Sequence, residues 1–254
     1  MSHSLHTLVR DLRLRRGRER RGLALAEGVR LVEEALAAKL VIRHTLASPG
    51  LEATPRGRAL KAALAAAGHV VTDTEEREFN GLAATEHPQG VLAVVEPPAW
   101  TLDDLRPGPR APVLVLDGVQ DPGNVGTMVR TAFALGAGGV LALPGTAELT
   151  NPKTLRATMG GYFRLPCVAV DEAAFRRWAE AAAVRVLIAA TNGTPPRSAR
   201  GTPLAVVVGN EGAGTRPSLE DWAHGRIGVP LREGAESLNV AVAAGILLYE
   251  VTSE

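Results

Sequence analysis

The sequence has very little cysteine and few aromatic residues. Its 254 residues include a single cysteine, Cys167, which excludes an intramolecular disulfide and a cysteine-based zinc cluster. Cys167 stands between Leu165-Pro166 and Val168-Ala-Val, and this apolar setting predicts a small buried residue rather than a nucleophile. Aromatic residues make up 4% of the chain, so alanine, leucine and valine must fill its cores.

Long hydrophobic runs are also missing. No segment approaches the roughly 20 consecutive apolar residues that a membrane span requires, and the first six residues lack the apolar core of a signal peptide. Apolar content of 46% and charged content of 22% describe an ordinary globular protein, long enough for one large domain or two modest ones. We therefore expect a cytoplasmic protein.

The net charge of the chain is close to zero, but positive charge is concentrated near its start. The net charge is +1, yet residues 1–30 hold eight arginines against three acidic residues. A basic arm on a nearly neutral body is typical of an element that contacts phosphates. The candidate RNA-binding residues are Arg13, Arg15, Arg16 and Arg18. The alternative interpretation is a solvated helix face.

A proline-rich stretch divides the chain. Residues 96–112 contain five prolines, and proline neither continues a helix nor donates to a central strand. We predict a domain at 1–96, a linker at 97–112 and a second domain at 113–254.

Before the linker, hydrophobic periodicity predicts a small alternating α/β domain. The expected helices lie around 26–38, 57–67 and 73–82, and the expected strands at 41–47, 69–72 and 90–95.

After the linker the alternation is clearer. Strands are expected at 113–117, 140–143, 167–170, 184–189, 204–208 and 227–229, with helical stretches near 125–136, 153–161, 171–183, 216–223 and 238–251. Apolar strands separated by helices indicate an α/β fold with a mainly parallel sheet covered by helices. The last helix is apolar almost all round, which predicts burial on most sides.

Three segments place glycines and polar residues where an apolar strand ends or an apolar helix begins. They are LDGVQDPGNVGTMVRTA at 116–132, VGNEGAG at 208–214 and VPLREGAESLNV at 229–240. Core packing does not require such residues there, whereas open α/β sheets bind ligands at these edges. In the first segment Asn124 is well placed to cap a helix that carries Arg130, and in the third Ser237 is a fair helix cap.

Read in order, the three segments resemble the motifs of the SpoU (TrmH) branch of the SPOUT RNA methyltransferases. The first domain also fits, through its AEG…EEAL pattern at 26–36 and its HPQGVLA close at 87–93. The resemblance implies S-adenosylmethionine (AdoMet) as cofactor and 2′-O-ribose methylation of structured RNA, with 23S ribosomal RNA as the first candidate. It further implies an N-terminal RNA-binding domain, a homodimer and a C-terminal trefoil knot over about 185–250.

The resemblance also assigns roles to residues. The expected catalytic residues are Asn124, Arg130, Glu211, Ser237 and Asn239. The expected cofactor-binding residues are Gly209, Val229, Leu231 and Leu238. No metal is required, and no His/Cys/Asp cluster suggests one.

Three other functions stay open at this point. Transfer RNA enzymes share these motifs, so the substrate could be tRNA. A catalytically silent RNA-binding module is a second alternative, although the retained polar residues disfavour it. A Rossmann oxidoreductase is disfavoured because no GxGxxG opens the first helix of the second domain, and no P-loop lysine follows the glycine-rich turn.

Overall fold

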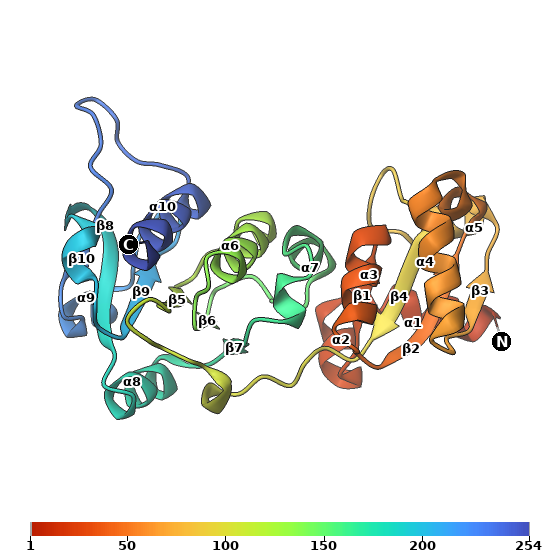
Figure 1. Cartoon of the computed structure of the whole chain (residues 1–254), viewed down its shortest axis with the longest axis horizontal. Helices are drawn as coiled ribbons and strands as arrows, with labels where there is room; N and C mark the ends of the chain where they lie inside the picture. Colours follow the sequence, from red (N-terminus) through yellow and green to blue (C-terminus); the bar gives the residue numbers. More distant parts are fainter. Residues whose placement is uncertain (1, 254) are drawn as a thin grey trace. The chain divides into compact units, whose positions relative to one another are not determined.

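The structure is a computed structural model of the chain, and it describes residues 2–253. These residues form two compact units (Figure 1). The first contains residues up to Ala99 together with Thr150–Phe163, and the second contains Trp100–Leu149 and Arg164 onward. The first division falls within the proline-rich stretch. The division predicted from the sequence assigns residues 150–163 to the second domain. In the structure, however, α7 (Pro152–Ala157) contacts β1 (Ala24–Glu27) of the first unit.

The first unit is a four-stranded sheet with helices on it. Its strand order is β1-β4-β2-β3, with β4 antiparallel to both of its neighbours and β2 parallel to β3. The remaining elements are β2 (Ile42–Ala47), β3 (Val71–Asp73), β4 (Val91–Val95), α1 (Ser2–Leu12), α2 (Arg15–Arg21), α3 (Val29–Ala37), α4 (Pro55–Ala66), α5 (Glu76–Leu82) and the 3₁₀ turns at Pro49–Ala53 and Gly161–Phe163. Strand β1 was not predicted, because its residues were read as the start of the helix that follows Gly28.

The arginine-rich arm folds into α1 and α2, and one of its arginines is structural. Arg18 is 4% exposed, and its guanidinium donates to the carbonyl oxygens of Leu12 and Arg13 at 2.9 Å each. The assignment of Arg18 to RNA binding is therefore wrong, because its donors satisfy the carboxyl end of α1. Arg13, Arg15 and Arg16 are exposed.

The second unit contains a six-stranded sheet that is parallel throughout, where the sequence predicted a mainly parallel sheet. The strand order is β10-β8-β9-β5-β6-β7. The strands are β5 (Val113–Leu116), β6 (Gly139–Ala142), β7 (Cys167–Ala169), β8 (Arg185–Thr194), β9 (Leu204–Val208) and β10 (Arg226–Ile227). The helices are α6 (Pro122–Ala134), α8 (Glu172–Ala181), α9 (Pro217–Trp222) and α10 (Val240–Thr252), with 3₁₀ turns at Leu102–Asp104 and Pro196–Ala199.

Both faces of this sheet are covered, which accounts for its nearly unbroken apolar strands. On one face Val115 and Val207 pack in a cluster with Phe175 of α8 and Leu219 of α9. Successive strand residues point to opposite faces, and helices α6 and α10 contact the sheet through β6 and β9. Cys167 is buried, as predicted, and burial raises the pKa of its thiol far above the usual range.

Helix α10 differs from its prediction. Ala244, Leu247 and Leu248 are buried, but Val242 is 51% and Tyr249 is 59% exposed. The helix is apolar all round, yet only one side of it is covered within the chain. The segment between β10 and α10 projects from the unit as a long loop (Figure 1).

Candidate functional site

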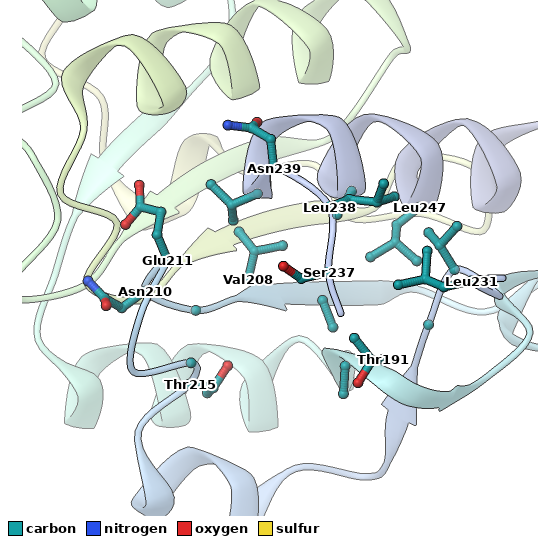
Figure 2. A pocket seen from close by; sticks show the side chains of 18 residues that line it. Thr191, Val208, Asn210, Glu211, Thr215, Leu231, Ser237, Leu238, Asn239 and Leu247 are labelled. Atoms are coloured by element: carbon teal, nitrogen blue, oxygen red, sulfur yellow. The ribbon is translucent and has the colours of Figure 1, made fainter. Parts of the chain in front are cut away.

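A cavity of about 440 Å³ opens at the carboxyl ends of β8 and β9 (Figure 2). Its walls come from the end of β8, the glycine-rich turn after β9, the loop before α10 and α10 itself. The lining residues are Ala189, Ala190, Thr191, Val208, Gly209, Asn210, Glu211, Gly214, Thr215, Gly228, Val229, Leu231, Ser237, Leu238, Asn239, Val240, Ala243 and Leu247. The second and third sequence segments therefore meet in one cavity at the sheet edge where α/β folds bind ligands.

The first segment is joined to the second by hydrogen bonds rather than by lining the cavity. The side-chain amide of Asn210 donates to the Gly118 carbonyl oxygen at 2.8 Å, and its Oδ1 accepts from the backbone N–H groups of Gly212 and Ala213. One side chain thus shapes the glycine-rich turn and attaches it to the loop after β5. Asn210 stood inside the quoted motif but carried no predicted role.

A chain of side-chain hydrogen bonds connects all three segments. Asn239 Nδ2 donates to Asn124 Oδ1 at 3.2 Å, and Asn124 Nδ2 donates to Glu211 Oε1 at 3.1 Å. The backbone N–H of Gln120 donates to the other carboxylate oxygen of Glu211 at 3.3 Å. Three of the five predicted catalytic residues therefore lie together, beside the cavity that Glu211 and Asn239 also line.

The environment of Glu211 favours its charged form. Burial alone would raise the pKa of this carboxyl, but the hydrogen bonds from the Asn124 side chain and from backbone N–H groups outweigh it, so the pKa lies below its usual range. Glu211 is therefore a carboxylate at neutral pH, able to accept hydrogen bonds and to attract positive charge.

Two predicted helix caps lie three and two positions away from the observed ones. Asp121, not Asn124, caps α6, because its carboxylate accepts from the Asn124 backbone N–H at 2.8 Å. Asn239, not Ser237, caps α10, through its Oδ1 and the N–H groups of Ala241 and Val242. Because Asp121 caps α6, the side chain of Asn124 is available to bridge Asn239 and Glu211. Asn239 caps α10 through its Oδ1 and donates to Asn124 through its Nδ2.

The predicted cofactor-binding residues all line the cavity, but Gly209 has a different constraint from the one expected. A Cβ added there would lie 2.3 Å from the Gly214 carbonyl carbon and 2.3 Å from the Thr215 nitrogen. Glycine is therefore required at 209 because the turn folds back on its own backbone. A bulkier residue would distort the turn before it met any ligand, so such a variant cannot report on cofactor contact alone.

Arg130 is not brought into this cluster within one chain. It lies on the exposed side of α6, and it is not among the residues that line the cavity. Ser237 does line the cavity, in the projecting loop. The predicted RNA-binding residues Arg13, Arg15, Arg16 and Arg18 belong to the first unit.

An ion pair that sequence reasoning missed holds the turn after β9. Asp117, 3% exposed at the end of β5, accepts from the Arg216 backbone N–H at 2.8 Å and from its Nε at 2.6 Å. Arg216 also donates to the Pro144 carbonyl oxygen at 2.8 Å. Such a pair is costly to break, since a buried carboxylate would be left without its partner. No short motif signals it, because the two residues are 99 positions apart.

The second unit thus combines a parallel α/β sheet with a glycine-lined cavity at the carboxyl edge of the sheet and an amide–carboxylate cluster beside the cavity. This arrangement is typical of an enzyme that binds a small ligand. Residues 111–249 match the model of the SpoU rRNA methylase family, and residues 8–93 match that of the MRM3-like substrate-binding domain. The chain belongs to the SpoU rRNA methylase family.

Individual relatives extend over nearly the whole chain. The chain is 36% identical to the 23S rRNA (guanosine(2553)-2′-O)-methyltransferase RlmP of Bacillus subtilis, over 95% of this chain and 93% of that protein. The AdoMet-bound rRNA methyltransferase from Sinorhizobium meliloti matches with a TM-score of 0.86 at 30% identity, over 99% of this chain and 95% of that one. AviRb from Streptomyces viridochromogenes, a SpoU methyltransferase in complex with AdoMet, matches with a TM-score of 0.84 at 27% identity, over 96% and 95%.

Proposed function

We propose that this protein transfers the methyl group of AdoMet to a ribose 2′-hydroxyl of ribosomal RNA, within the 23S molecule. The observation that carries the proposal is the series of side-chain hydrogen bonds from Asn239 through Asn124 to Glu211, beside the cavity that Glu211 and Asn239 line. The names of the relatives support the substrate class. The ribosomal substrate would place the enzyme in the cytoplasm. In the described part of the chain, no helix has the length and apolar character that crossing a bilayer demands.

The cavity suits AdoMet in size and chemistry. Its lining combines apolar side chains with amide, hydroxyl and carboxylate groups, and its volume lies in the range of small-molecule sites. Val229, Leu231 and Leu238 would pack against the cofactor, with the backbone at Gly209 lying against it. When bound, AdoMet supplies an electrophilic methyl group on its sulfonium sulfur.

The residues of the chain would position the nucleophile and ease the loss of its proton. Asn124, Ser237 and Asn239 would orient the ribose, and the Glu211 carboxylate would hold the Asn124 amide in place. Arg130 would bind the target phosphate. A guanidinium stays protonated at neutral pH, so a water oriented by Arg130 is a better proton acceptor than the side chain itself. Holding the reacting atoms within near-attack distance accounts for much of such a rate enhancement.

We further propose that the second unit pairs with a second copy of the chain through α6 and α10. A groove of about 500 Å³ between these helices is lined by Val242, Ile246 and Tyr249 and reaches Asn124 and Asn239. Apolar residues exposed along a helix are typical of a protein interface. A homodimer would bring the exposed Arg130 of α6 close to such an interface, where it could serve either active site.

The dimer proposal predicts that Val242→Arg yields a monomer. A charged side chain at this half-exposed position would be desolvated on pairing, whereas it is hydrated in a monomer. Val70→Arg, at an 82% exposed valine of the first unit, is the matched control and should leave the mass unchanged. Sedimentation velocity measures both. A Val242→Arg protein that still sediments as a dimer would place the interface elsewhere.

We propose that the domain at 1–96 binds RNA and that residues 113–254 form the catalytic domain with the trefoil knot. Replacing Arg13, Arg15 and Arg16 with alanine should then weaken RNA binding and flatten its salt dependence. For every phosphate that the protein no longer neutralises, the slope of log K against log salt falls by about 0.9 on a duplex. Arg18 is kept, because its hydrogen bonds are structural. Filter binding at several salt concentrations measures the slope. An unchanged slope would show that these three residues form only a solvated helix face and do not contact RNA.

A further inference from the structure

A second pocket, of about 280 Å³, lies within the first unit. The two stretches of the first domain that resemble the family, at 26–36 and 87–93, both contribute to its wall. A third part of the wall comes from α7 and the turn after it. The lining residues are Glu27, Gly28, Arg30, Leu31, Thr85, His87, Gln89, Arg156 and Met159. The methyl-transfer chemistry proposed above uses none of them.

The turn after β1 and the loop before β4 are attached to each other at this pocket. The backbone N–H of Val29 donates to Gln89 Oε1 at 2.9 Å. Gly28 has a φ of +98°, and a Cβ added there would lie 3.1 Å from the same oxygen, so this close approach favours glycine. Because Oε1 is engaged, the Gln89 amide keeps two N–H donors for a ligand.

The buried carboxylate in the pocket wall already has its partners. Glu27 is 4% exposed, and its oxygens accept from the backbone N–H groups of Ala84 at 2.7 Å and Thr85 at 3.1 Å. These hydrogen bonds hold the start of the loop before β4. Glu27 therefore shapes the pocket and needs no cation from a ligand.

Positive charge outweighs negative charge in the pocket, since two guanidinium groups face one carboxylate. Arg30 is exposed and pairs with Glu34 at 2.6 Å. Arg156 of α7 is partly exposed, and it forms no ion pair with the described residues. A guanidinium without an acidic partner in a pocket wall suits a phosphate, which it can bind through two parallel N–H groups.

The rest of the lining suits a flat ring. Leu31 is 2% and Met159 is 39% exposed, and both add apolar surface to the pocket. His87 is exposed, and its ring forms no hydrogen bond with the described residues. Methionine sulfur and imidazole rings both pack well against aromatic rings. Ring-packing surface, amide donors and an unpaired guanidinium together match a base, the edge of that base and its phosphate.

We infer that this pocket binds one unpaired nucleotide of the RNA substrate. The base would pack against His87 and Met159, the Gln89 amide would donate to an acceptor on its edge, and Arg156 would bind its phosphate. Nucleotides of a duplex stay stacked, whereas those of loops and bulges can be splayed out into a protein pocket. The inference rests on the proposed function, because it takes RNA as the ligand of the first unit.

The test compares His87→Ala and Arg156→Ala with the matched controls His44→Ala and Arg77→Ala. The controls alter exposed residues of the first unit that do not line the pocket. Filter binding measures the affinity of each protein for unmodified 23S rRNA and for a fully paired RNA duplex. We expect each pocket variant to bind 23S rRNA about tenfold more weakly, in keeping with the loss of one stacked base or one charged hydrogen bond. Its duplex affinity, and both affinities of the controls, should stay within about twofold of wild type, because paired bases do not enter the pocket.

Crosslinking locates the nucleotide without any substitution. Ultraviolet light joins an RNA base to a side chain that it touches, and mass spectrometry then maps the peptide that carries the nucleotide. We expect an adduct within 85–89 or 156–159 when wild-type protein is bound to 23S rRNA. Adducts confined to other peptides, pocket variants that bind 23S rRNA like wild type, or an equal loss of duplex binding would each overturn the inference. A wild-type protein that forms the adduct but transfers no methyl group to RNA would instead overturn the proposed function alone.

Discussion

Arg130→Ala is expected to abolish methyl transfer while its affinity for AdoMet stays within a few-fold of wild type. Arg130 is exposed on α6 and outside the cavity, so its removal leaves the cofactor site and the core intact. In the proposed mechanism it removes the cation that binds the target phosphate, so the loss is expected in the reacting complex and not in cofactor binding. Single-turnover rates with labelled AdoMet and calorimetry with the cofactor measure the two effects separately.

The matched control is Arg177→Ala, which removes an exposed arginine from α8 and should leave the rate unchanged. If Arg130→Ala keeps more than about a tenth of the wild-type rate, the loss of transition-state stabilisation is under about 1.4 kcal/mol. The proposed role of Arg130 would then be wrong.

Asn239 substitutions are expected to separate capping from chemistry. Asn239→Ala loses both the cap of α10 and the hydrogen bond to Asn124, whereas Asn239→Asp keeps the cap but has no N–H to donate. If Asn124 turns its amide to meet the new carboxylate, it presents oxygen to Glu211, so one hydrogen bond is broken in either orientation. We expect turnover to fall about 10²-fold in both variants, because a misplaced reacting group costs this much.

Stability should distinguish the two Asn239 variants. Asn239→Ala should lower the free energy of unfolding by about 1 kcal/mol, and Asn239→Asp should not, since aspartate is an equally good cap. Asp171→Ala, which removes the cap of α8, is the control that should cost stability without costing activity. Urea unfolding followed by tryptophan fluorescence gives the stabilities. A fully active Asn239→Asp enzyme would show that the amide chain has no part in catalysis.

The sequence predicted the parallel sheet well because its strands are apolar on both faces and separated by helices. Few folds other than a parallel sheet covered by helices accommodate this pattern. The helix caps and the structural role of a single arginine were harder to predict. Aspartate, asparagine and serine are all good caps, so sequence alone could not choose Asp121 over Asn124 or Asn239 over Ser237. Arg18 looked like its arginine neighbours, and only the folding of α1 against α2 buries it.

Interactions between distant residues were the other limit. The pair of Asp117 with Arg216 and the packing of α7 in the first unit depend on the path of the chain in space. The exposed side of α10 could not be read from a helix that is apolar all round, since the same pattern serves a core and an interface.

The most direct test of the proposed function is methyl transfer to RNA in vitro. Wild-type protein and Arg130→Ala are incubated with methyl-labelled AdoMet and either unmodified 23S rRNA or tRNA, and the modified nucleotide is then mapped. We expect label in 23S rRNA with wild-type protein alone, at one ribose, where the 2′-O-methyl group protects the adjacent bond from alkaline cleavage. Label on a base, label confined to tRNA, or an unlabelled 23S rRNA despite bound AdoMet would contradict the proposal.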